Sequence, residues 1–254
     1  MSAATVCTVR SARPSVFPEV SLQMLRMTNR EHTQQVIDWV RQRTDSVILF
    51  YSTGKDSIAM LDLVAPHFKR VVCVYMYFVP GLEHIRKYID WSTLRYPNVE
   101  FVEVPHWNLT YILRSGMYCT PQPDVKLMKL GDVARNCRLR FGIEWCFYGM
   151  KQADGMNRCI MLRGKDYELQ AIQPKTKNVY PLSVWSNNEV LAYIRQNRLP
   201  EPVCYDRKTK SQGLVFSEAS FLYLRENYPG DLEKILAAFP QAEVILYKHD
   251  HPNG

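Results

Sequence analysis

The chain has 254 residues, of which 46% are hydrophobic and 22% charged, with a formal net charge of +7. This balance is typical of a soluble globular protein, and no apolar run approaches the roughly 20 residues that a membrane span needs. The N-terminus lacks the apolar core of a secretory signal, and the seven cysteines are odd in number, which favours free thiols over a disulfide framework. We therefore expect a cytoplasmic protein with no membrane partner.

The first hundred residues predict apolar strands that alternate with helices, after a loosely ordered arm at 1–28. The continuous apolar strands are expected at 46–51, 70–78 and 99–104. The helices are expected from Thr28 or Asn29 to about Arg43, then at 56–66 and 82–95. Such a pattern is typical of a parallel sheet with helices on both faces. We predict an α/β fold with a doubly wound, mostly parallel, Rossmann-like sheet, whose ligands lie beyond the carboxyl ends of the strands.

The rest of the chain predicts a fourth strand at 144–150 and further helices. We expect a short helix at 107–115, a mobile loop at 117–130, a helix near 131–141 and two short strands within 168–182, joined at 175–178. Ser186 and Glu189 form a capping-box pattern for a helix that runs to about Asn197. Helices near 217–227 and 230–238 precede a short apolar run at 244–247. We expect one α/β domain at 29–200, with a C-terminal helical extension at 201–254 packed on it.

The polar loop 51–57, Tyr-Ser-Thr-Gly-Lys-Asp-Ser, follows the first strand and leads into a helix. Gly54 permits a tight turn, and the next amides lie at a helix N-terminus, where free N–H groups and the helix dipole favour anions. The hydroxyls of Ser52 and Ser57 can add donors, Lys55 a positive charge and Asp56 a carboxylate for a metal ion. The loop is not a Walker A motif, because Leu49 and Asp56 stand where that motif needs Gly and Ser/Thr. The alternative is an ordinary strand–helix turn with a serine cap.

Three segments carry a resemblance to a known family. The loop 52–57 resembles the PP-loop, Ser-Gly-Gly-x-Asp-Ser, of the adenine-nucleotide α-hydrolase superfamily, with Thr53 in place of the first Gly. Residues 149–158 resemble the Gly-Ile-Arg-Arg-Asp-Gln-Ser-x-x-Arg segment of sulfonucleotide reductases, with Lys151 at an Arg position and Asp154 displaced by one. Residues 180–194 resemble the Pro-Leu-x-x-Trp-x-x-x-x-Val-x-x-Tyr-Ile segment of phosphoadenylyl-sulfate (PAPS) reductases and their relatives. Together they are similar to the PAPS reductase-like branch of that superfamily.

The resemblance implies an adenosine nucleotide, either ATP or a PAPS-like compound, together with Mg²⁺ at Asp56. The residues implied in nucleotide binding are Ser52, Thr53, Gly54, Lys55 and Ser57 at the phosphates, and Tyr75, Met76 and Tyr77 at the adenine. The residues implied in catalysis are Lys55, Asp56, Lys151 and Arg158. The last two form a cationic pair beyond the fourth strand that would neutralise phosphate or sulfate oxygens, although a solvated helix start is the alternative.

The chain departs from sulfonucleotide reductases at their C-terminal catalytic cysteine. The last cysteine here is Cys204, and Leu214 stands where some members have Cys. We expect Cys73, Cys146 and Cys159 to face the core, which leaves Cys119 and Cys137 as candidate nucleophiles. Among the histidines, His106 follows the third strand and could approach a nucleotide or lie on the surface. His249, Asp250 and His251 could hold a metal, but a polar chain terminus is the simpler interpretation.

These observations predict an enzyme that cleaves ATP or a related nucleotide at the α–β linkage, releases pyrophosphate and adenylates an acceptor. We expect the acceptor to be a nucleic acid or a protein, and the sequence does not name it. One alternative is a PAPS reductase with a displaced or partner-supplied thiol. Another is a non-catalytic nucleotide- or nucleic-acid-binding accessory protein that uses the basic cluster 207–210, whose binding would weaken steeply with salt.

Overall fold

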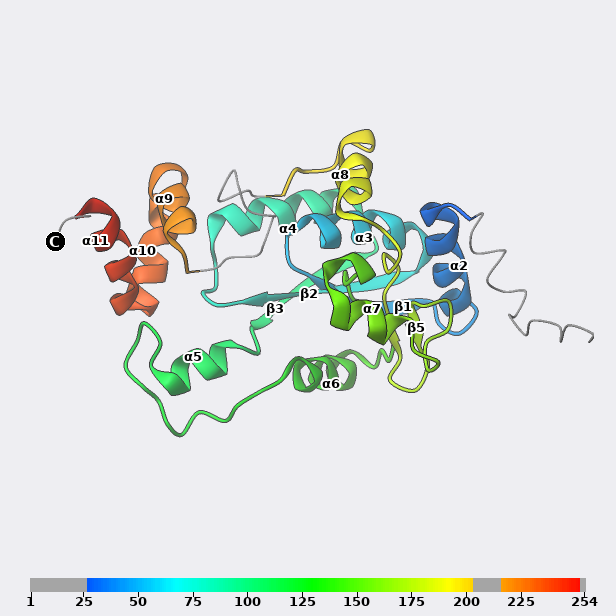
Figure 1. The fold of residues 1–254 in the computed structure, drawn as a ribbon, viewed down its shortest axis with the longest axis horizontal. Coiled ribbons are helices and arrows are strands. Elements are labelled where there is room, and N and C mark those ends of the chain that lie inside the picture. The colour runs from blue at the N-terminus through cyan, green and yellow to red at the C-terminus, as the bar shows by residue number, and fades with distance from the viewer. Residues whose placement is uncertain (1–26, 203–215, 252–254) are drawn as a thin grey trace, which may run out of the picture.

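A six-stranded, mostly parallel sheet forms the centre of the protein (Figure 1). The computed structural model describes residues 27–202 and 216–251, so most of the arm predicted at 1–28 and the basic cluster 207–210 lie outside the described residues. The strand order is β3-β2-β1-β4-β6-β5. The strands are β1 (Ser46–Tyr51), β2 (Arg70–Tyr77), β3 (Val99–Pro105), β4 (Cys146–Phe147), β5 (Ile172–Gln173) and β6 (Asn178–Val179). Only the β5–β6 pair is antiparallel.

Helices cover both faces of this sheet, and further helices follow at the C-terminal end of the described chain. The helices are α2 (Asn29–Arg41), α3 (Lys55–Val64), α4 (Glu83–Arg95), α5 (Leu109–Ser115), α6 (Leu130–Phe141), α7 (Met156–Leu162), α8 (Asn187–Gln196), α9 (Glu218–Asn227), α10 (Pro229–Ala238) and α11 (Val244–Asp250). Alternate residues of β1 point to opposite faces: Leu49 packs in a core with α2, α3 and α8, whereas Ile48 packs in a core with α6 and α7. The predicted doubly wound α/β sheet is therefore confirmed.

The C-terminal helices pack on the carboxyl end of β2 and the start of α4. Phe221 of α9 and Ile235 of α10 share a buried core with Val79 and Leu82. The carboxylate of Asp231 accepts hydrogen bonds from the backbone amides of Glu83 and His84, at 2.7 and 2.9 Å. Asp231 thereby caps α4, whose own N-cap residue Leu82 supplies no side-chain bond.

The sequence prediction was wrong about the length of the fourth strand. Residues 144–150 were expected to be extended and paired, but β4 comprises only Cys146 and Phe147. The Tyr148 amide still donates to the Val179 carbonyl at 2.9 Å, and the chain leaves the sheet after it. It continues into a 3₁₀ turn at Gln152–Asp154 and the helix α7, which were not predicted as separate elements. The apolar run at 244–247 lies in α11, with Leu246 buried and Tyr247 exposed.

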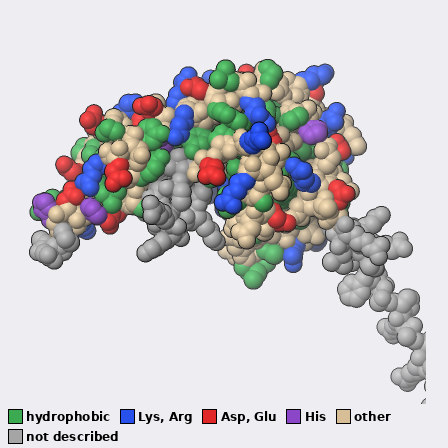
Figure 2. All heavy atoms as spheres, turned by 90° about the horizontal axis from the view of Figure 1, so that it is seen from above, with side chains coloured by type: hydrophobic (Ala, Val, Ile, Leu, Met, Phe, Trp, Pro, Cys, Tyr) green, Lys and Arg blue, Asp and Glu red, His purple; other side chains and the backbone are tan. Residues whose placement is uncertain are grey.

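The surface carries both signs of charge. On the face shown in Figure 2, lysine and arginine side chains are interspersed with acidic ones and do not form a continuous basic patch. Within the described ranges, no helix is both long and apolar enough to cross a bilayer.

Candidate functional site

A cleft of about 460 Å³ opens beyond the carboxyl ends of β1 and β4. The chain runs from β1 to β2 and β3 on one side and returns through β4 on the other, so this point is where the strand order reverses. In doubly wound sheets, ligands bind in the crevice at such a switch point. The cleft is lined by Phe50, Ser52, Lys55, Asp56, Ser57, Met76, Leu130, Tyr148, Gly149, Met150, Asp154, Arg158 and Asn187.

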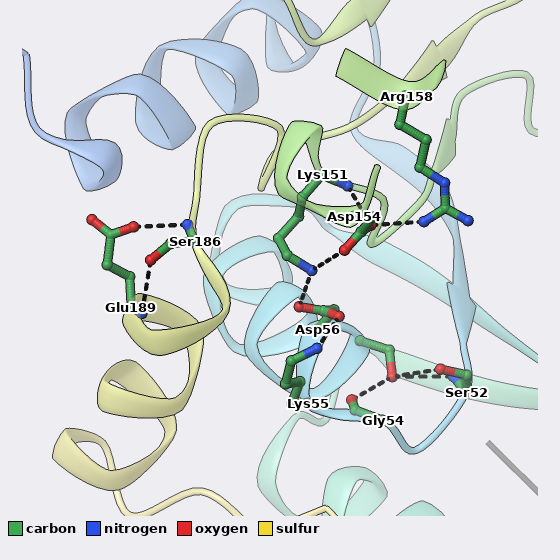
Figure 3. A network of polar contacts seen from close by, with 10 residues as sticks. Ser52, Gly54, Lys55, Asp56, Lys151, Asp154, Arg158, Ser186 and Glu189 are labelled. Atoms are coloured by element: carbon green, nitrogen blue, oxygen red, sulfur yellow. Dashed lines mark hydrogen bonds and ion pairs between the residues drawn. The ribbon is translucent and has the colours of Figure 1, made fainter. Parts of the chain in front are cut away.

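The loop 52–57 forms one wall of this cleft. Gly54 is the N-cap of α3 and provides no side-chain cap, and the backbone N–H groups of residues 54–57 have no hydrogen-bond partner among the described residues. The Ser57 hydroxyl braces the turn: it donates to the Gly54 carbonyl at 2.9 Å and accepts from the Ser52 amide at 3.1 Å (Figure 3). The result is a helix N-terminus with free donors at a cleft, which is an arrangement that binds anions.

Thr53 occupies a left-handed backbone conformation, with φ of +56°. This conformation is unfavourable for a β-branched residue and natural for glycine, which the PP-loop pattern has at this position. Its hydroxyl donates to the Ser52 carbonyl at 2.6 Å, and the side chain is buried, 6% exposed, outside the cleft lining. Thr53 therefore keeps the turn that the pattern requires, at a cost in backbone strain.

Five charged side chains form a continuous chain of ion pairs beside the loop (Figure 3). We call Lys55, Asp56, Lys151, Asp154 and Arg158 the ion-pair chain. The Asp56 carboxylate accepts from the Lys55 and Lys151 ammonium groups, each at 2.7 Å. Asp154 accepts from Lys151 at 2.9 Å and from Arg158 at 2.7 Å. The chain carries three cations and two carboxylates, so it has a formal charge of +1 beside the free amides.

Lys151 is the centre of the ion-pair chain and is fully buried, with 0% of its side chain exposed. It is not part of the cleft lining, whereas Lys55, Asp56 and Arg158 are. Burial alone would raise the pKa of the Asp154 carboxyl, but hydrogen bonds from the Lys151 side chain and backbone and from Arg158 outweigh it and lower that pKa. Asp154 is therefore held as a carboxylate, and Lys151 positions both acidic groups.

Gly149 brings the end of β4 against the start of α3. A Cβ atom at this position would lie 3.2 Å from the Asp56 Cβ and 3.4 Å from the Asp56 backbone carbon. This spacing is tighter than ordinary van der Waals contact, so a larger residue would push the two segments apart. Gly149 thus sets the distance between the helix N-terminus and the opposite cleft wall.

The three strand-end residues expected to hold adenine do not share one environment. Met76 lines the cleft, but the side chains of Tyr75 and Tyr77 pack in the core on the opposite face of the sheet. This follows from the alternation of side chains along a strand. The wall near Met76 instead presents Phe50 and Tyr148, whose rings stack with centroids 4.8 Å apart. Neither ring was predicted from the sequence to lie in the site, although Phe50 is the penultimate residue of β1, two positions before the loop 52–57.

The remaining candidates lie away from the cleft lining. His106 stacks on Phe78 at 4.5 Å, and His249 pairs with Glu218 at 2.6 Å. No group of three or more potential metal ligands occurs within 27–202 and 216–251. Cys119 and Cys137, left open as nucleophiles, are buried, and Cys159, expected in the core, is half-buried.

No family model and no curated protein matches this chain, but many solved structures are similar to it, and three of them are described next. The U34-tRNA thiolase NcsA from Methanococcus maripaludis is 16% identical, with 85% of this chain and 78% of that chain covered and a TM-score of 0.46. The PAPS reductase from Candida auris is 11% identical, with 77% and 92% covered and a TM-score of 0.47. The NH3-dependent NAD synthetase from Campylobacter jejuni is 13% identical, with 90% and 97% covered and a TM-score of 0.45. These neighbours are members of the PP-loop adenine-nucleotide α-hydrolase superfamily, which the motifs of this chain resemble.

Proposed function

We propose that this chain is an adenosine-nucleotide enzyme that cleaves ATP, or a related nucleotide, between the α and β phosphates. A nucleophile of the acceptor attacks the α-phosphorus, the bond from that phosphorus to the bridging oxygen breaks, and pyrophosphate leaves with the bonding electron pair. The observation that carries the proposal is the set of amides at 54–57 that have no partner within 27–202 and 216–251, located on the wall of a cleft at the switch point of the sheet.

The loop 52–57 would stabilise the leaving pyrophosphate. In the proposed reaction, its amides and the dipole of α3 would face the negative charge that develops on the leaving group, and preorganised donors of this kind are a large contributor to catalysis. Lys55 supplies a cation on the cleft lining, and Arg158 supplies another at the start of α7. Lys151 acts through Asp56 and Asp154, since it is buried behind them, and is a positioning residue.

The ion-pair chain does not present a ready site for Mg²⁺ at Asp56. Mg²⁺ prefers free oxygen ligands, but both Asp56 oxygens accept hydrogen bonds from lysine ammonium groups. The other carboxylate of the lining, Asp154, is likewise paired with Lys151 and Arg158. In this arrangement lysines neutralise the carboxylate, and the role of Asp56 in the proposal is to hold Lys55 and Lys151 in place.

Pyrophosphate release from ATP by the purified protein, tried with candidate acceptors, tests the proposal. Wild type is expected to release pyrophosphate and AMP or an adenylated acceptor. The variant Lys55→Met should lose most of this turnover, whereas Lys69→Met, which alters an exposed lysine far from the cleft lining, should retain it. Release of orthophosphate and ADP instead, or full activity of Lys55→Met, would contradict the proposed cleavage.

The described residues offer less support for the two alternatives. A reductase needs an accessible thiolate, and none of the five described cysteines lines the cleft. Burial raises the pKa of Cys73 and Cys137, and that of Cys146 to about 11, which disfavours their thiolates at neutral pH. A nucleic-acid-binding role rests on the cluster 207–210, which lies outside the described residues.

A further inference from the structure

A second cavity, of about 370 Å³, lies on the opposite face of β2 from the cleft. Tyr75 lines this cavity and its neighbour Met76 lines the cleft, because successive side chains of a strand point to opposite faces. The cavity is bordered by β2, β3, α4 and α10, which Figure 1 labels, and the two sites share no lining residue. We call it the β2–α4 pocket. Its volume is within the range of small-molecule sites, about 300–1,000 Å³.

The hydroxyl of Tyr75 makes no hydrogen bond within the described residues, although the residue is only 8% exposed. The fully buried side-chain atoms without a partner in this part of the chain are His32 Nδ1, Ser183 Oγ and Asn187 Oδ1, so the Tyr75 hydroxyl keeps some accessible surface. Of the cavities that the described residues form, Tyr75 lines only the β2–α4 pocket. Buried hydroxyls normally have a partner, and a ligand in this pocket can supply one.

The two cationic side chains of the pocket already have partners. The Lys234 ammonium group donates to the Gly81 carbonyl at 2.6 Å and lies 3.8 Å from Asp231 Oδ1. The Arg86 guanidinium donates through Nε to Asp90 Oδ1 at 2.8 Å. The attraction of the pocket for an anion is therefore weak, because a carboxylate close to each cation offsets its charge.

The two acidic side chains of the pocket, in contrast, have no ion pair within 27–202 and 216–251. Glu103 is the register partner of Tyr75, so its side chain leaves the sheet on the same face. Burial and the negative charges of Glu103 and Asp231 raise the pKa of Tyr75, so its hydroxyl stays neutral in a negative potential. Glu83, in the first turn of α4, adds a second carboxylate. These groups favour a ligand with a positive charge.

The rest of the pocket wall is aliphatic. Its side chains are those of Val79, Leu82, Ile85 and Ile89. Such a wall favours an apolar body, which is removed from water on binding. We propose that the β2–α4 pocket binds a small organic amine, with the apolar body against this wall and the ammonium group at Glu103 and Tyr75. The carboxylate and the hydroxyl oxygen each accept one ammonium hydrogen bond. The site goes beyond the proposed function and requires no nucleotide in the cleft.

Calorimetric titration at neutral pH with 2-phenylethylamine, 2-phenylethanol and 3-phenylpropanoate tests the proposal, because the three probes share an apolar body and differ in charge. Wild type is expected to bind the amine with a dissociation constant of about 5 mM or tighter, as its small size allows. The alcohol and the carboxylate should bind at least about 10-fold more weakly. Glu103→Gln and Tyr75→Phe should each weaken amine binding about 3- to 10-fold.

Matched controls locate the amine and separate binding from folding. Glu100→Gln changes another glutamate of β3 that does not line the pocket, and should retain the wild-type affinity for the amine. Lys55→Met alters the cleft and should retain it as well. The melting temperature of Tyr75→Phe without ligand should not fall, because the hydroxyl has no hydrogen bond within the described protein to lose.

No binding of the amine up to about 10 mM, or equal affinity for the three probes, would overturn the proposal. Full amine affinity in either Glu103→Gln or Tyr75→Phe would also overturn it, as would a marked fall in the melting temperature of Tyr75→Phe. Tighter binding of 3-phenylpropanoate than of the amine would show that the pocket selects an anion. Weaker amine binding in Lys55→Met would place the amine in the cleft. Either result would rule out the proposed site. Absence of pyrophosphate release in a protein that binds the amine would refute the proposed function alone.

Discussion

Lys151 Nζ lies 2.7 Å from Asp56 Oδ1, although the two residues are 95 positions apart in the chain. The contact joins the segment after β4 to the first turn of α3, and the same ammonium group pairs with Asp154 at 2.9 Å. Because Lys151 is fully buried, its charge is compensated by these two carboxylates. One lysine therefore fixes the two walls of the cleft relative to each other.

Replacing Lys151 with methionine should destabilise the fold by about 3–5 kcal/mol, because two partly buried carboxylates lose their shared cation. Urea unfolding followed by circular dichroism measures the change. Lys165→Met, at an exposed lysine near the end of α7, should leave the free energy of unfolding within about 0.5 kcal/mol of wild type. Equal stability of the two variants would contradict the role assigned to Lys151.

Replacing Thr53 with glycine should relieve the strain of its positive φ. Strain of this kind costs about 1–3 kcal/mol, part of which is offset by the greater flexibility of glycine in the unfolded chain. We expect Thr53→Gly to match or exceed wild type in the free energy of unfolding. Thr33 is the matched control, because it is also buried with its hydroxyl bonded to a carbonyl, but lies in α2. Thr33→Gly should lower the free energy of unfolding by at least about 1 kcal/mol. An equal loss in Thr53→Gly would contradict the claim that the backbone at Thr53 is strained.

Adding a methyl group at Gly149 should disturb the start of α3. Gly149→Ala places a Cβ against Asp56, and overpacking of this kind typically costs about 1–3 kcal/mol. ATP affinity, measured by calorimetry, should fall as well, because the amides of the loop move. Gly131→Ala is the control, since a Cβ there meets nothing within 4 Å. Wild-type affinity and stability in Gly149→Ala would show that the close approach is unimportant.

Acid should weaken the attachment of the C-terminal helices through Asp231. Burial alone would raise the pKa of Asp231, but bonds from the amides of His84 and Glu83 and from the His84 ring lower it overall. In the unfolded chain the pKa of an aspartate is about 4, and in the folded protein that of Asp231 is lower. Asp231 therefore stabilises the fold fully above about pH 4, and this stabilisation is lost as the pH falls through the folded-state pKa. Burial also lowers the pKa of His84, so the fold favours its neutral form. The stabilisation that this neutral form gives is lost as the pH falls below about 6.5, the pKa of an unperturbed histidine.

The measurement for Asp231 is the free energy of unfolding as a function of pH. Wild type should lose stability from neutral pH to about pH 3, and Asp231→Asn should be less stable at neutral pH with a shallower acid dependence. Asp124→Asn, at an exposed position, should reproduce the wild-type curve. The same slope in Asp231→Asn as in wild type would contradict this account of the docking.

The parallel sheet could be predicted because its strands are continuous apolar runs. The residues 47–51 of β1 and 71–75 of β2 are all buried, so these stretches carry no polar interruptions and are easily separated from the amphipathic helices. The capping box at Ser186 was also predicted, and the structure confirms it, because it depends only on residues three apart.

The long-range parts of the site could not be predicted from the sequence. The pairing of Lys151 with Asp56 and the approach of Gly149 to α3 depend on how β4 lies beside β1, and no local pattern encodes them. β4 was predicted too long because its apolar residues Tyr148 and Met150 line the cleft and do not continue the sheet.

The central claim is that the backbone amides of residues 54–57 bind the phosphates of the nucleotide. The most direct test is a titration in which nuclear magnetic resonance monitors the resonances of these four amides. ATP and inorganic tripolyphosphate should both shift these four resonances, whereas adenosine alone should leave them nearly unchanged. If ATP binds while the four amides stay at their free positions, the phosphates are held elsewhere and the proposed site is wrong.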